Sequence, residues 1–218
     1  MRQVIAIDGP SGAGKTTIAK LIAKELGFDY LDTGALYRAA ALALRNNSVE
    51  PEDSDDKLHA ILSSTHITFN NGKVFLNGRD VSEDIRTAEI DHYSSVYSER
   101  KIVREFLLNA QRDAAFYSDL VVEGRDTTTV IFPDAKKKIY LDASIEERAK
   151  RRYSQFRGRG FDISMEECRK KIIDRDTRDG GRDIAPLKVA SDALLVDSSH
   201  LSIEQVMEKI FDYIRTDH

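Results

Sequence analysis

One short segment, residues 9–16, constrains the fold more than any other part of the chain. It reads Gly-Pro-Ser-Gly-Ala-Gly-Lys-Thr and matches the pattern G-x-x-x-x-G-K-[ST]. It follows an apolar run at residues 4–8 and precedes a helical stripe that begins at Ile18. Glycines in this pattern let successive backbone N–H groups point at phosphate oxygens beside a helix N-terminus. The segment therefore predicts a strand, a phosphate-binding loop and a helix.

We expect this loop to bind ATP with Mg²⁺. The Lys15 ammonium can reach the β- and γ-phosphates, and the Thr16 hydroxyl can ligate magnesium directly. A regulatory GTPase would also need an N-K-x-D element, and the chain contains no Asn-Lys dipeptide. A small-molecule kinase suits the 218 residues best. The predicted ATP-binding residues of the loop are Gly9, Pro10, Ser11, Gly12, Ala13, Gly14, Lys15, Thr16 and Thr17.

Apolar runs alternate with helical patterns along most of the chain. The candidate strands are residues 4–8, 28–32, 120–123, 138–142 and 194–197. This alternation predicts an α/β protein with the P-loop NTPase fold, in which helices cover a five-stranded parallel sheet. Gly27 should end the first helix, and Ser144, Ser164 and Ser202 should each begin a later one. The lone Cys168 excludes an internal disulfide and favours a reducing, cytoplasmic setting.

Two regions depart from the alternation. Residues 66–79 read as a β-hairpin, with Asn-Gly at 71–72 suited to a turn that needs positive φ. We expect one domain over residues 1–218, with a core at about 1–61 and 91–218 and an inserted subdomain at about 62–90.

Residues 148–182 hold nine arginines and three lysines against six acids. Such a stretch indicates either a solvated helix pair or forked contacts with phosphate oxygens. With Gly158 and Gly160 it reads as a mobile helical lid at about residues 150–163. The candidate ATP contacts from this stretch are Arg148, Arg151 and Arg157.

A second polar segment, residues 30–38, begins at a strand and runs into a helix. It reads Tyr-Leu-Asp-Thr-Gly-Ala-Leu-Tyr-Arg. We expect Thr33 to cap the helix and Arg38 to follow little more than one turn later. A hydroxyl and a guanidinium beside the phosphate loop would suit an acceptor phosphate, although an ordinary cap with a surface arginine has the same pattern.

At this point the chain resembles the bacterial-type cytidylate (CMP) kinases, essentially from end to end. The matching segments are DGPSGAGK at 8–15, LDTGALYR at 31–38, VSEDIR at 81–86, EGRD at 123–126, FPDA at 132–135, ERA at 147–149, RDTRD at 175–179 and APL at 185–187. The resemblance implies phosphoryl transfer from ATP to CMP and dCMP. We expect a monomer whose partners are small molecules. The acidic remainder of the chain disfavours a nucleic acid polymer, and no apolar run is long enough to span a membrane.

The resemblance also implies roles for individual residues. Arg38, Arg125 and Arg182 correspond to the grip on the acceptor phosphate, and Lys15, Arg125 and Arg182 to the catalytic cations. Ser95, Arg104 and Asp126 correspond to the readers of cytosine, and Arg175 and Asp179 to the ribose contacts. A carboxylate can accept a hydrogen bond from the N4 amino group of cytosine, whereas the O4 of uracil would repel it.

Glu123 ends the apolar run at 120–122, and we expect it to bind Mg²⁺ through water, with a structural arginine partner as the alternative. One departure from the family lies nearby. Residues 125–129 read Arg-Asp-Thr-Thr-Thr, where the family usually has glycine in place of Thr128. If the backbone there needed positive φ or a close approach, Thr128 would cost stability or shift the loop, and the acceptor geometry would then differ from that of the family.

No general base is expected, because a phosphate acceptor is already largely ionised at neutral pH. Catalysis should come from in-line positioning and charge neutralisation, with the lid excluding water. Two alternatives remain open on the sequence alone: a kinase for another small acceptor such as shikimate or gluconate, and a nucleotide sensor without catalysis.

Overall fold

The computed structural model describes residues 2–70, 72–158 and 160–216. Its centre is a five-stranded sheet in the order β2-β6-β1-β7-β8, with every neighbouring pair parallel. This confirms the predicted fold class. The strands are β1 (Val4–Asp8), β2 (Asp29–Asp32), β6 (Leu120–Gly124), β7 (Lys137–Asp142) and β8 (Leu194–Asp197). The second strand begins one residue later than expected.

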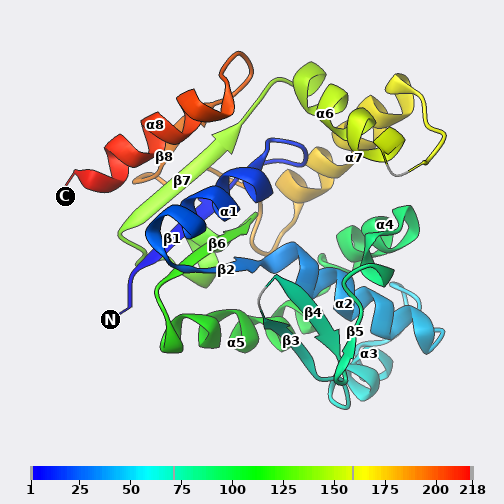
Figure 1. The fold of residues 1–218 in the computed structure, drawn as a ribbon. Helices are drawn as coiled ribbons and strands as arrows, with labels where there is room; N and C mark the ends of the chain where they lie inside the picture. The colour runs from blue at the N-terminus through cyan, green and yellow to red at the C-terminus, as the bar shows by residue number, and fades with distance from the viewer. Residues whose placement is uncertain (1, 71, 159, 217–218) are drawn as a thin grey trace.

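Helices cover both faces of the sheet (Figure 1). Successive side chains of β1 point to opposite faces, so Ile5 and Ile7 lie in one core cluster and Ala6 in the other. On the first face the strands pack against α1 (Lys15–Leu26) and α8 (Ile203–Arg215). On the second they pack against α2 (Thr33–Asn46) and α5 (Lys101–Tyr117), and α3 (Asp55–Leu62) packs against these two helices. The continuous apolar strands follow from this burial on both sides.

The helix boundaries follow local signals in the sequence. Gly27 adopts a left-handed conformation (φ 70°) and donates its N–H to the carbonyl of Ala23, which ends α1. Ser164 and Ser202 form the predicted capping boxes of α7 (Met165–Gly181) and α8. Ser144 accepts the Glu147 N–H at 3.3 Å at the start of α6 (Ile145–Gly158).

The expected hairpin is present as β3 (Ile67–Asn70) and β4 (Lys73–Leu76), which pair antiparallel. A third short strand, β5 (Arg79–Asp80), extends it and was missed in the sequence. Gly72 has the positive φ (77°) that the Asn-Gly pair predicts, while residue 71 lies outside the described residues. Ile67 and Val74 are buried, and they pack this small three-stranded sheet against the core cluster around α2. A 3₁₀ turn, η1 (Asp84–Arg86), and α4 (Ala88–Tyr97) follow.

The carboxyl ends of the strands face an open side of the molecule, where β1 turns into α1 (Figure 1). The pair α6 and α7 stands on one flank of this region, and α2 and α4 stand on the other. After β6 the chain makes a single π-helical turn, η2 (Thr127–Ile131). Arg159, in the predicted lid, lies outside the described residues. Within the described ranges, no helix combines the length and apolarity that crossing a membrane requires.

Candidate active site

A cavity of about 730 Å³ lies at the carboxyl ends of the strands. The phosphate-binding loop forms one wall, and its curl depends on close backbone approach. A Cβ on Gly9 would lie 1.9 Å from the carbonyl oxygen of Leu141 on β7, so only glycine fits there. Gly14 adopts φ 99° and begins α1, whose free N–H groups face the cavity. The predicted residues Ser11, Gly12, Ala13, Gly14, Lys15, Thr16 and Thr17 line the cavity.

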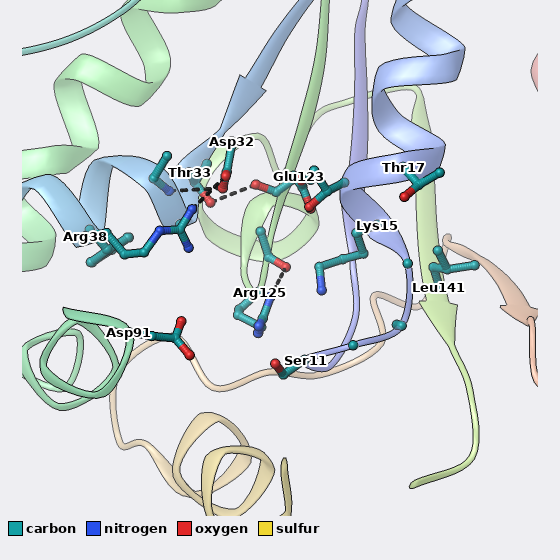
Figure 2. A pocket seen from close by; sticks show the side chains of 18 of the residues that line it. Ser11, Lys15, Thr17, Asp32, Thr33, Arg38, Asp91, Glu123, Arg125 and Leu141 are labelled. Carbon is teal, nitrogen blue, oxygen red and sulfur yellow. Dashed lines mark hydrogen bonds and ion pairs between the residues drawn. The ribbon is translucent and has the colours of Figure 1, made fainter. Parts of the chain in front are cut away.

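Lys15 is buried in this wall, and its ammonium is held by the loop itself. Its Nζ donates to the carbonyl oxygens of Gly9 at 2.7 Å and Pro10 at 2.8 Å. Burial, aided by the positive charge of Arg125, lowers the pKa of Lys15 to about 7. A phosphate placed beside the ammonium would favour its charged form. In Figure 2 Lys15 and Arg125 lie near each other on one side of the pocket.

The carboxylate of Asp8 joins the phosphate-binding strand to the loop after β6. Asp8 is fully buried and accepts four hydrogen bonds. Two come from the N–H and hydroxyl of Thr127, at 2.9 and 2.7 Å, and two from the N–H and hydroxyl of Thr128, at 2.8 and 2.6 Å. Burial raises the pKa of Asp8, and these four donors oppose the rise. This role of Asp8 was not predicted from the sequence, although an acid just before a phosphate-binding loop is a signal for it.

This arrangement explains the threonine that departs from the family pattern. The residues with positive φ include several glycines, Ser48, Asn77 and Ala185, but not Thr128. The backbone at Thr128 therefore does not need glycine, and the strain that a positive φ would cause there is absent. Its hydroxyl instead supplies the fourth donor to Asp8.

Glu123 lies buried between Lys15 and Asp32, next to the phosphate-binding loop. Burial and the charge of Asp32 raise its pKa, whereas Lys15 and the hydroxyls of Tyr30 and Thr16 lower it. Its partner is the Tyr30 hydroxyl, which donates to Oε1, rather than the arginine considered as an alternative. In proteins, Mg²⁺ is usually bound by one or two carboxylates, by water and by substrate phosphates. The Thr16 hydroxyl beside the carboxylates of Glu123 and Asp32 fits this set of ligands.

Asp32 organises the start of the acceptor wall. It is the N-cap of α2, where its Oδ1 accepts the Ala35 N–H at 3.0 Å and its Oδ2 pairs with Arg38 at 2.8 Å. The prediction that Thr33 caps this helix is wrong. A carboxylate one residue earlier takes that position, and the Thr33 hydroxyl donates instead to the carbonyl of Glu123 at 2.8 Å. Thr33 and Arg38 both line the cavity.

Arg125 and Arg182 converge on one buried carboxylate, Asp179. The Arg125 Nε donates to Asp179 Oδ2 at 2.9 Å, and Arg182 Nη1 lies 3.9 Å from Oδ1. Burial alone would raise the pKa of Asp179, but Arg125, Arg175 and Arg182 lower it overall. Asp179, expected as a ribose contact, thus positions guanidinium groups in this structure. The three predicted phosphate-gripping arginines line the same cavity.

The predicted base readers Arg104 and Asp126 form a buried ion pair, with side chains 8% and 5% exposed. The Arg104 guanidinium also donates to the carbonyl of Ser98 at 3.0 Å and lies 5.4 Å from the ring centre of Tyr37. The pair sets donors beside an acceptor at the cavity wall. The sequence did not point to Tyr37 or Ser98, because an aromatic residue on a helix and a serine in a turn usually have ordinary structural roles.

Ser95 lies apart from this pair. Its side chain is buried, and its Oγ has no hydrogen-bond partner among the described residues. It lines a second cavity of about 450 Å³, between α4 and α7, rather than the main one. Asp91 and Arg175 line both cavities, so the two adjoin. The structure therefore does not bring Ser95 together with Arg104 and Asp126.

Of the three predicted lid contacts, only Arg151 lines the main cavity; its Nη1 donates to the carbonyl of Ala13 at 3.0 Å. Arg148 is buried behind the loop, where it donates to the carbonyl of Ser11 at 3.1 Å and pairs with Asp176 at 2.7 Å. This position corrects its expected contact with ATP.

Arg157 is half exposed and pairs with Asp162 at 3.0 Å, away from the residues that line the cavity. Arg152 lines the cavity and was not predicted. Arg151 and Arg152 are adjacent on α6, and the sequence does not fix how the helix is rotated. It therefore could not show which of the two side chains reaches the cavity.

The fold and the loop define this protein as a P-loop kinase by class. The chain matches the family model described as cytidylate kinase over residues 5–216. It is 50% identical to the cytidylate kinase of Thermosipho melanesiensis, with 97% of this chain and 96% of the relative aligned. It is 47% identical to that of Thermodesulfovibrio yellowstonii over the whole of both chains. The protein therefore belongs to the cytidylate kinase family.

Solved structures agree on the fold. A shikimate kinase from Bacteroides thetaiotaomicron aligns with a TM-score of 0.51 at 12% identity, covering 98% of this chain and 99% of its own. An uncharacterized protein from Eubacterium ventriosum aligns with a TM-score of 0.56, also at 12% identity, covering 99% of this chain and 100% of its own. Likeness at this level of identity concerns the fold alone.

The Asp8 cluster yields a testable prediction. Thr128→Val keeps the shape of the side chain and removes one donor to a buried carboxylate, which should destabilise the protein by about 1–3 kcal/mol at pH 7. Because the folded-state pKa of Asp8 lies above its ordinary value, protonation near pH 4 should relieve part of this loss. Urea unfolding at both pH values measures it.

Thr128→Ser retains the hydroxyl and is the matched control, which should stay close to the wild-type protein. A loss of stability in Thr128→Val that is equal at the two pH values would contradict the role of the hydroxyl.

Proposed function

We propose that this protein transfers the γ-phosphate of ATP to CMP, giving ADP and CDP. The observation that carries the proposal is the gathering of two sets of cationic groups in one cavity. Lys15 and the phosphate-binding loop form the first set, and Arg38, Arg125 and Arg182 form the second, with Arg125 next to Lys15. A phosphoryl group passing between two phosphates needs such an arrangement, because charge develops on the oxygens at both ends. The family membership and the cytidylate kinase activity named for the relatives support the same reading.

The transfer is direct and in line. The acceptor is a phosphate oxygen that is largely ionised at neutral pH, so no residue has to remove a proton from it. Lys15 stabilises the donor side, while Arg125 and Arg182 orient the acceptor phosphate and neutralise its charge. The Thr16 hydroxyl and the Glu123 carboxylate would hold Mg²⁺, which would supply further neutralisation of the ATP phosphates. Arg151 steadies the loop from the lid side.

Cytosine is read at the Arg104 and Asp126 pair. The Asp126 carboxylate accepts from the N4 amino group, and the Arg104 guanidinium donates to the ring acceptors. Uracil would place its O4 against the carboxylate and leave buried groups unpaired, which discriminates strongly. Ser95 and Arg175 complete the acceptor site, with Ser95 on the base and Arg175 on the ribose. Ser95 would reach the base only after α4 moves, since it now lines the adjoining cavity.

Three further points stay predictions from the sequence: use of dCMP alongside CMP, a monomeric state and a cytoplasmic location. The direct test of the function is ADP release in a coupled assay, with CMP, dCMP, UMP, AMP and shikimate as parallel acceptors. We expect release with CMP and dCMP well above the others. Binding of ATP without any acceptor-dependent release would instead identify a sensor, and release with shikimate would identify another kinase.

Removing the loop lysine should abolish turnover without unfolding the protein. Lys15→Ala takes away the ammonium that faces the donor phosphates, so kcat should fall by at least about 100-fold. The exposed Lys24→Ala on the same helix is the control and should behave like the wild type. Circular dichroism checks the fold of both variants. An unchanged kcat in Lys15→Ala would refute the role of Lys15.

Substitution at the base-reading carboxylate should erode the preference for CMP over UMP. Asp126→Asn keeps the side-chain shape, and its amide can donate to uracil O4, so the ratio of kcat/KM values should fall by about tenfold or more. Asp126→Ala should lower it too, although the bare Arg104 charge will cost stability. Asp134→Asn, an exposed acid in the following segment, is the control. If the ratio stays the same, Asp126 does not read the base.

A further inference from the structure

Asp91 on α4 bridges elements that lie far apart in the sequence. Its Oδ1 accepts from Arg175 Nη1 on α7 at 2.8 Å, and its Oδ2 accepts from Arg152 Nη2 on α6. The carboxylate lines both cavities and points toward the pocket interior, on the side where Ser11 lies (Figure 2). No role was predicted for Asp91 from the sequence. Asp91 thus ties α4 to both α6 and α7.

The two ion pairs continue into the acceptor site. Arg175 and Asp179 are four residues apart on α7, which places them on one face of the helix. The Arg175 Nε lies 3.9 Å from Asp179 Oδ2, much farther than the 2.8 Å that separates Arg175 from Asp91. The same Oδ2 accepts Arg125 Nε at 2.9 Å. Charges therefore alternate along the series Arg152, Asp91, Arg175, Asp179, Arg125.

This series sets up a competition for Asp179. Arg175 is a permanent cation with a side chain only 17% exposed, so it needs a carboxylate partner. With Asp91 in place, Arg175 is paired there and leaves Asp179 to Arg125. Without the Asp91 charge, the acid nearest to the Arg175 Nε is Asp179, whose Oδ2 is the atom that holds Arg125.

We infer that Asp91 is a positioning residue for the acceptor site: by pairing with Arg175, it leaves Asp179 free to hold Arg125 in place. This inference rests on the proposed function, since it concerns the grip of Arg125 on the acceptor phosphate. The effect of Asp91 on Arg125 passes through Arg175 and Asp179.

The test is a double-mutant cycle on the full chain, with KM and kcat measured for CMP and for ATP. Asp91→Asn removes the charge and keeps the shape, so KM for CMP should rise by about tenfold, while KM for ATP stays within about twofold. Asp91→Glu should restore part of the loss. Asp162→Asn removes a comparable acid from the Arg157 pair outside the cavity and is the control.

The second arm is Arg175→Gln, alone and combined with Asp91→Asn. If Asp91 acts by keeping Arg175 away from Asp179, the double variant should bind CMP no worse than Arg175→Gln alone. Additive losses would overturn the inference, and so would an unchanged KM for CMP in Asp91→Asn. A wild-type protein that leaves CMP untouched would instead reject the proposed function, and the inference with it.

Discussion

The four hydrogen bonds that converge on the Asp8 carboxylate join the two halves of the site. Asp8 ends β1, directly before the phosphate-binding loop, and its partners Thr127 and Thr128 directly follow Arg125 and Asp126. The phosphate-binding loop and the loop after β6 are therefore fixed to one buried point. A buried carboxylate tolerates this place because every bond it accepts offsets part of its desolvation.

The cavity concentrates arginines, and acids next to them make that concentration tolerable. Asp32 pairs with Arg38, Asp126 with Arg104, and Asp179 with Arg125. Buried guanidinium groups without partners would repel one another and destabilise the fold. Paired, the guanidinium groups are held in place at the cavity wall.

Much of the fold could be predicted from the sequence because its signals are local. These signals set the structure of the chain next to them: the loop at residues 9–16 joins a strand to a helix, the capping serines begin helices, and Gly27 ends one. The sheet order and β5 could not be predicted, since pairing depends on distant segments. At the site, the residue types identified the cationic side chains, but not which of them point into the cavity. Arg148 and Arg152 differ by one turn of α6, yet the first lies behind the loop and the second in the cavity, and only tertiary packing separates them.

The proposed transfer uses no general base, and the acids of the cavity are already engaged in other contacts. A base needs a free lone pair and a pKa near the working pH. Asp179 is held by arginines that lower its pKa, and Asp8 already accepts four hydrogen bonds. Glu123, whose pKa is raised, accepts the Tyr30 hydroxyl and faces the donor side. Each of these carboxylates is thus occupied by hydrogen bonds or ion pairs that hold neighbouring groups in place. An acceptor that arrives already ionised is the kind of substrate such a cavity can serve, because its chemistry requires charge placed correctly rather than a proton removed.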